Sequence, residues 1–177
     1  MRALGPGSVS SLLKIALDVA FFLLWVVLGV IVLGLVSSFF VPLDNFSATF
    51  EDDAGQVREL ALTRSLVACS LLGVIAWIGG FVAIVHRLRR IFATLTAGGP
   101  FRPENTRRLR EIGLFLSLIV AAQFATQYVG SRIAPGAIEA PGFTQLMTPL
   151  FSVLVVFVLA EVFREGARLR REQELTI

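Results

Sequence analysis

Apolar residues along this chain fall into four long runs, at residues 15–40, 65–85, 112–129 and 148–163, which polar or turn-forming segments separate. A helix that crosses the hydrocarbon core of a bilayer needs roughly 20 mostly apolar residues, because each residue adds about 1.5 Å of length. All of the runs come close to this length. The pattern therefore predicts an all-α, polytopic membrane protein with four transmembrane helices in a single domain, residues 1–177.

The composition supports this class of protein. Hydrophobic residues make up 55% of the chain and charged residues 16%, and the mean hydropathy is +0.78. Soluble domains carry about 25% charged residues. The spans and their connections use nearly all of the 177 residues, so we expect no separate soluble catalytic domain. The pI near 10.0 reflects arginines that lie beside the spans, and we do not expect direct binding of nucleic acid.

Basic residues are distributed unevenly among the connections. The N-terminal segment, the connection 86–111 and the tail after residue 163 hold 13 of the 16 lysines and arginines. Short loops rich in these residues stay on the cytoplasmic side of a membrane. Both termini and the central connection are therefore predicted to be cytoplasmic.

The connections also predict the arrangement of the helices. An apolar stripe at residues 88, 91, 92 and 95 indicates that the second helix continues beyond the membrane, and Pro103 with Glu104 is typical of the start of the next helix. Short connections favour antiparallel neighbours. We therefore expect a four-helix bundle, running up and down, with cytoplasmic helical extensions.

The first outer connection, residues 41–64, is acidic. Residues 46–50 alternate apolar and polar positions, which weakly indicates a short strand, and the favoured interpretation is a solvated loop. A cation or partner site at Glu51, Asp52 and Asp53 is the alternative, although adjacent carboxylates lack the alternate spacing of a calcium loop.

No motif for catalysis or for a cofactor is found in the chain. One cysteine, Cys69, cannot form an internal disulfide, and one histidine, His86, cannot complete a structural zinc site with it. We therefore expect no enzyme activity, no cofactor and no metal.

Small and amide side chains inside the spans predict helix packing. Small residues that recur every four positions let helix backbones approach closely, and glutamine side chains hydrogen-bond between helices in lipid. A polar lining of a small cavity is the alternative for the glutamines. The candidate packing residues are Ser65, Cys69, Gly73, Ala76, Gly80, Gln123 and Gln127.

Ionisable residues lie near the predicted cytoplasmic ends of the spans. Charges at this depth are usually paired, because an isolated charge in lipid is unfavourable. Lys14, Asp18, Arg87 and Glu161 therefore form a candidate collar of ion pairs. A proton or ion relay is the alternative, and the lack of any acidic residue near the middle of a span disfavours it.

Two segments resemble a known family. They are GGPFRPEN at residues 98–105 with RLREIG at 108–113, and VFREGARL at residues 162–169 with Glu172 and the closing ELTI. Together they are similar to the family of small bacterial membrane proteins labelled domain of unknown function 2975. The resemblance implies a protein of the bacterial cytoplasmic (inner) membrane with no established activity. It also implies a small helix-turn-helix regulator as a partner, since members are often encoded beside one.

These segments suggest one cytoplasmic surface for binding a partner. Its candidate residues are Phe101, Asn105, Arg108, Leu109, Phe163, Gly166, Arg168 and Leu169. The alternative is that the same residues only pack together and cap the bundle. The leading hypothesis is a non-enzymatic interaction or regulatory protein. It would present the basic connection at residues 86–111 and the tail to its partner.

Two further functions stay open besides that hypothesis. One is an accessory subunit of a larger membrane complex, such as an energy-converting assembly, and the other is a small transporter or channel component. The lipid bilayer is a partner in every case, and the sequence leaves the oligomeric state open.

Overall fold

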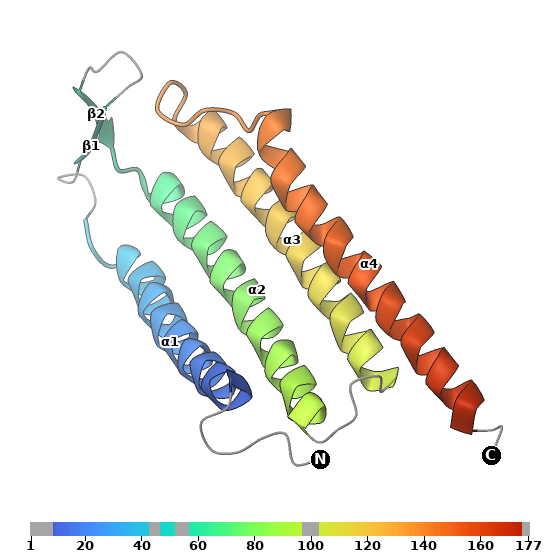
Figure 1. Ribbon diagram of the computed structural model, residues 1–177. Coiled ribbons are helices and arrows are strands. Elements are labelled where there is room, and N and C mark those ends of the chain that lie inside the picture. The colour runs from blue at the N-terminus through green and yellow to red at the C-terminus, as the bar shows by residue number, and fades with distance from the viewer. Residues whose placement is uncertain (1–8, 43–46, 52–56, 97–102, 175–177) are drawn as a thin grey trace.

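The computed structural model describes residues 9–42, 47–51, 57–96 and 103–174. In chain order its elements are α1 (Val9–Ser38), β1 (Ser47–Glu51), β2 (Val57–Ala61), α2 (Arg64–Thr96), α3 (Pro103–Ile133) and α4 (Phe143–Glu174). Successive helices run in opposite directions (Figure 1). All four are long and apolar enough to cross a membrane, as the sequence predicted.

Local sequence signals explain the ends of the helices. The Leu66 amide donates to Thr63 Oγ1 at 3.4 Å, so Thr63 caps the start of α2. Helix α3 begins at Pro103 and carries Glu104 in its first turn and Arg132 in its last. Both charges interact favourably with the helix dipole and so stabilise the helix. Beyond α3, Gly136 adopts a φ of 83°, a conformation that glycine adopts without strain.

The helices form an open layer instead of the closed bundle that the sequence predicted. Helix α2 packs between α1 and α3, and α4 packs only on α3, so that in the described chain α1 has no backbone contact with α3 or α4 (Figure 1). Lipid solvates apolar side chains as well as another helix does, so no hydrophobic force closes the layer. The bundle prediction was wrong in this respect.

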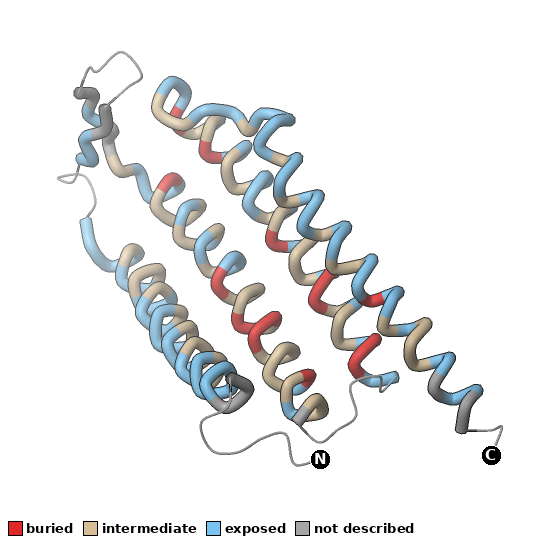
Figure 2. Tube along the Cα trace, in the orientation of Figure 1, coloured by how far each residue is buried: buried red, intermediate tan, exposed pale blue. Residues whose placement is uncertain are grey.

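The best-buried part of the molecule lies between α2 and α3. Ile84 and Ile91 of α2 meet Ile112 and Ile119 of α3 in one cluster. Buried residues concentrate on these helices, and none of the described side chains of α1 is buried (Figure 2). Helix α1 exposes many large apolar side chains, as a helix surrounded by lipid does.

The first outer connection contains a β-hairpin. Strands β1 and β2 pair antiparallel, from Ser47 opposite Ala61 to Glu51 opposite Val57. The weak alternation at residues 46–50 was therefore a real strand signal, and the favoured interpretation as a plain loop was incomplete. Asp52 and Asp53 lie outside the described residues, and Glu51 ends β1.

Candidate functional site

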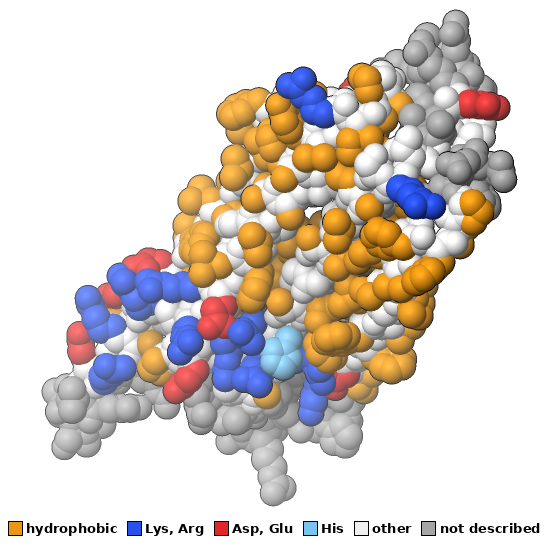
Figure 3. Space-filling model, turned by 180° about the vertical axis from the view of Figure 1, so that it is seen from behind, with side chains coloured by type: hydrophobic (Ala, Val, Ile, Leu, Met, Phe, Trp, Pro, Cys, Tyr) orange, Lys and Arg blue, Asp and Glu red, His pale blue; other side chains and the backbone are white. Residues whose placement is uncertain are grey.

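Charged side chains gather at one end of the helix layer, while apolar side chains cover its middle (Figure 3). This charged end comprises the starts of α1 and α3 and the ends of α2 and α4 (Figure 1). Candidate functions of this protein therefore concentrate there, where side chains can meet water and soluble molecules.

Three of the four collar residues, Asp18, Arg87 and Glu161, form ion pairs between neighbouring helices. Asp18 of α1 pairs with Arg89 of α2 at 2.5 Å. Arg87 of α2 pairs with Glu111 of α3. Lys14 lines a cleft of about 450 Å³ together with Asp18.

Glu161 completes this chain of contacts by joining α4 to α3. Its carboxylate lies 3.7 Å from Arg110 of α3, and it also pairs with Arg164 of its own helix. Half-exposed pairs of this kind contribute about 0–1 kcal/mol each. They therefore contribute little to the stability of the fold.

An aromatic contact that sequence reasoning missed accompanies the first of these pairs. The Arg89 guanidinium lies 4.6 Å from the centre of the Phe21 ring, which attracts it through a cation–π interaction. The same ring lies 5.9 Å from the His86 ring. In the sequence, the only sign of this contact was the spacing of Asp18 and Phe21, which lie three residues apart and therefore share a face of α1.

A buried polar clamp joins α2 to α3 at the charged end. Asn105 is 0% exposed, and its Oδ1 accepts hydrogen bonds from Thr94 Oγ1 at 2.9 Å and from Arg108 Nη1 at 3.0 Å. Arg108 Nη1 also donates to the Arg90 carbonyl at 3.3 Å. We call Thr94, Asn105 and Arg108 the hairpin clamp.

The clamp corrects the predicted interaction surface. Asn105 and Arg108 face α2 and hold the hairpin together, and Leu109 packs against the isoleucine cluster. Asn105 is buried, and Arg108 and Leu109 are half-buried on the side of α3 that faces α2. Of the remaining candidates, Phe163 and Gly166 are half-buried, Arg168 and Leu169 are exposed, and Phe101 lies outside the described residues.

The small residues of α2 behave differently from one another. A Cβ added at Gly73 would collide with Thr126, and one added at Gly80 would collide with Ile119, so both glycines pack directly on α3. Cys69 Sγ lies 4.0 Å from the Thr126 carbonyl oxygen.

Ser65 and Ala76 are exposed, so within the described chain they do not pack closely on another helix as Gly73 and Gly80 do. A step of four residues turns a helix by about 400°, so a stripe of such steps drifts about 40° per step away from its neighbour. The residues of α2 that contact α3, which we call the seam of α2, instead recur every seven positions, at Gly73, Gly80 and Arg87.

The two glutamines border a groove between α2 and α3. The groove has a volume of about 540 Å³, and its lining includes Gly73, Trp77, Thr126 and both glutamines. Gln123 is exposed and Gln127 is half-buried. This position agrees with the alternative of a polar cavity lining rather than with buried contacts between helices.

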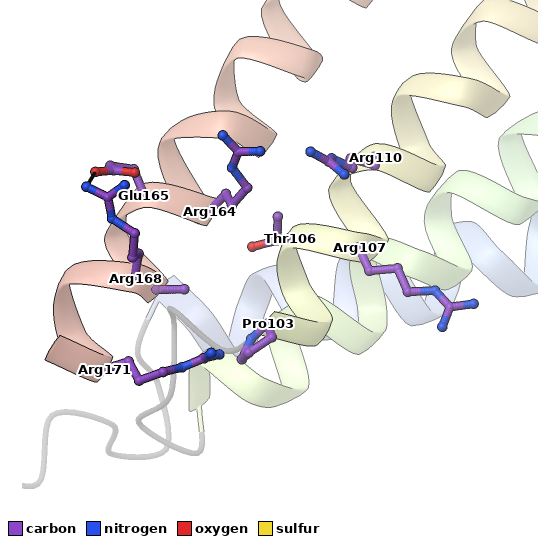
Figure 4. A pocket seen from close by; sticks show the side chains of 9 residues that line it. Pro103, Thr106, Arg107, Arg110, Arg164, Glu165, Arg168 and Arg171 are labelled. Atoms are coloured by element: carbon purple, nitrogen blue, oxygen red, sulfur yellow. Dashed lines mark ion pairs between the residues drawn. The ribbon is translucent and has the colours of Figure 1, made fainter. Parts of the chain in front are cut away.

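A second cleft opens at the charged end, between the start of α3 and the end of α4 (Figure 4). Its volume is about 630 Å³. It is lined by Pro103, Thr106, Arg107, Arg110, Arg164, Glu165, Ala167, Arg168 and Arg171. We call it the arginine cleft. Sequence reasoning had grouped Arg168 of the tail with residues at the start of α3 in one candidate surface, and had interpreted the other arginines of this cleft as loop charges.

Comparison with known proteins identifies the family. Residues 41–177, from the β-hairpin through α4, match the family described as Protein of unknown function (DUF2975). No curated protein and no solved structure matches the chain. The family match covers well over half of the chain and includes the hairpin clamp and the arginine cleft. The chain therefore belongs to the family described as Protein of unknown function (DUF2975).

Proposed function

We propose that this chain is a non-enzymatic protein of the bacterial cytoplasmic membrane that presents a basic surface to a partner. Its termini and residues 86–111 face the cytoplasm, as the distribution of lysines and arginines favours. The basic surface consists of the arginines of the arginine cleft: Arg107, Arg110, Arg164, Arg168 and Arg171.

The observation that carries this proposal is the placement of these arginines on two neighbouring helices, α3 and α4. The predicted fourth span ends at residue 163, yet α4 continues to Glu174, which extends it by roughly 16 Å. Charge that only orients a protein in a membrane needs no such support. Here two helices hold the arginines side by side, with Arg107 84% exposed at the start of α3 (Figure 4). Exposed guanidinium groups that gather at one place favour recognition of an acidic partner.

The orientation can be tested with single cysteines at Glu59 of β2 and at Arg107 of α3, in a Cys69→Ala background. Both positions are exposed and lie at opposite ends of the layer. A membrane-impermeant maleimide should label the Glu59 position in intact cells and the Arg107 position only after the membrane is opened. Labelling of the Arg107 position in intact cells would refute the proposed orientation.

The interaction can be tested by co-purification in mild detergent. The double variant Arg168→Gln/Arg171→Gln removes two exposed charges of the basic surface, and Arg64→Gln removes one exposed charge at the opposite end as a control. Wild type and the control should recover the same protein in stoichiometric amount, and the double variant should lose most of it. A small helix-turn-helix regulator is the partner that the family resemblance implies. Recovery that is equal for all three chains, or absent for all, contradicts the proposal.

An accessory subunit of a larger membrane complex is the second candidate. The open layer favours it, because α1 and α4 each contact only one other helix of the described chain. A chain of this kind should migrate in native gels as part of a large membrane assembly. Migration at the size of the chain plus a small soluble protein favours the regulatory interaction instead.

A further inference from the structure

Thr106 carries a buried hydroxyl group that lacks a hydrogen-bond partner within the described chain. The residue is 8% exposed. Hydroxyl groups further along α3 bond back to the carbonyl one turn earlier, as Thr126 does to Ala122 at 2.8 Å and Ser117 does to Gly113 at 2.9 Å. A buried polar group is rarely left unpaired, so an unpaired one indicates a missing partner.

A partner for this hydroxyl can approach from the arginine cleft, which Thr106 lines. The Thr106 hydroxyl points from α3 toward α4, and Arg171 of α4 extends toward Pro103 at the start of α3 (Figure 4). Arg110 and Arg164 point toward each other across the cleft (Figure 4). The unpaired hydroxyl and three guanidinium groups thus surround one space.

The ion pairs of the cleft leave donors for a ligand. Arg168 is held by Glu165 at 2.7 Å and by Glu172 at 3.4 Å. Arg171 pairs with no carboxylate whose side chain the structure describes. Arg110 lies 3.7 Å from Glu161, a distance at which its N–H groups keep most of their donor capacity. The start of α3 adds the positive end of its helix dipole.

We propose that the arginine cleft binds a phosphate group, carried by a lipid headgroup or by a soluble phosphate. A planar guanidinium matches two phosphate oxygens at once, and a phosphate has enough oxygens to accept from several arginines and from the Thr106 hydroxyl together. A carboxylate has only two oxygens, and one arginine can occupy both. Helix starts are common sites for phosphate.

The size and place of the cleft extend the argument. Its volume of about 630 Å³ exceeds that of a phosphate ion, so it leaves space for whatever the phosphate is attached to. The cleft lies at the charged end, next to the apolar middle of the layer, where a lipid headgroup can reach it (Figure 3). This inference rests on the proposed function, because it names the chemistry that the basic surface recognises.

The experiment titrates the purified full chain, in a neutral detergent, with inorganic phosphate and separately with dihexanoyl phosphatidic acid. Dihexanoylglycerol, which lacks the phosphate, measures any purely apolar binding. Saturable binding of both phosphate compounds identifies a site for the phosphate group itself, and binding of the lipid alone identifies a headgroup site. Both results support the inference. No saturable binding of either compound overturns it.

Substitutions locate the site within the cleft. Thr106→Val replaces the hydroxyl by a methyl group of the same shape and should weaken binding about tenfold, the loss expected for one hydrogen bond to a charged group. Its unfolding midpoint should not fall, because the hydroxyl has no partner to lose. Thr106→Ser keeps the hydroxyl and should bind nearly as the wild type does. Wild-type affinity in Thr106→Val overturns the site.

Charge variants separate a built site from general attraction. Arg171→Gln should weaken binding about tenfold, whereas Arg90→Gln should weaken it much less, because Arg90 is exposed at the charged end but does not line the arginine cleft. Equal losses in the two variants overturn the inference in favour of diffuse attraction. If the chain fails to bind phosphate but still recovers a protein partner, only the phosphate inference is contradicted. If it binds phosphate but recovers no protein partner, only the proposed protein interaction is contradicted.

Discussion

Replacing Gly73 by leucine should destabilise the protein by about 3 kcal/mol, the upper part of the range for overpacking a close contact. A Cβ at this position would meet the Thr126 side chain, including its Cβ at 3.0 Å. Because that atom is fixed to the backbone of α3, rotation of the threonine cannot make room, and the two helices must separate. The unfolding midpoint in mild detergent should therefore fall, and packing between α2 and α3 should loosen first.

Gly79→Leu is the matched control for this prediction. It makes the same change in the same helix and gains the same helix propensity, yet a Cβ at Gly79 meets nothing within 4 Å. Its unfolding midpoint should stay close to that of the wild type, since the new side chain extends into lipid or detergent. Gly80→Leu should behave as Gly73→Leu does, through Ile119. Equal midpoints for the Gly73 and Gly79 variants would refute the proposed close contact.

Asn105→Ala should have the second large effect, a loss of about 3 kcal/mol. The substitution removes the acceptor that Thr94 and Arg108 share inside the hairpin clamp. Because the Asn105 side chain is 0% exposed, water cannot easily replace the lost oxygen. The guanidinium of Arg108 loses a partner and the start of α3 loosens from the end of α2. Thermal unfolding in detergent and proteolysis of the segment that joins α2 to α3 both report this change.

Two further variants test whether the acceptor oxygen is the cause. Asn105→Asp keeps an oxygen for both donors and should lose clearly less stability than Asn105→Ala. Glu104→Ala changes the exposed neighbour in the same turn and should cost under about 1 kcal/mol, the effect of one charge near a helix start. If Asn105→Ala unfolds at the temperature of the wild type, the clamp does not stabilise the hairpin.

Because of the hairpin clamp, substitutions of Arg108 and Arg168 report on different properties of the protein. On the sequence alone, Arg108 and Arg168 belonged to one candidate surface. In the structure Arg108 reaches back to the Arg90 carbonyl and Asn105, whereas Arg168 pairs only with glutamates of its own helix. Arg168 and Arg171 are therefore the better variants for a binding experiment, and Arg108 reports on stability.

Hydrophobicity along the chain was sufficient to locate the four helices, while the distribution of basic residues predicted the charged end and two short motifs predicted the family. Whether a segment can cross a membrane depends on its own length and composition, so neighbours are not needed to predict it. The family resemblance likewise depends on short motifs at the start of α3 and the end of α4, and the match over residues 41–177 confirms it. The β-hairpin was almost missed, because its strands have only 5 residues each and one showed a weak alternation.

Only the tertiary structure decided which side chains meet. Helices that are apolar on every side can rotate about their axes without exposing a polar face, so their sequences do not specify which face a neighbour covers. Gly73 and Gly80 were therefore not separable from Ser65 and Ala76 before the seam of α2 was known. For the same reason the open layer, the burial of Asn105 and the Thr106 hydroxyl in the arginine cleft depend on how α3 is turned between its two neighbours.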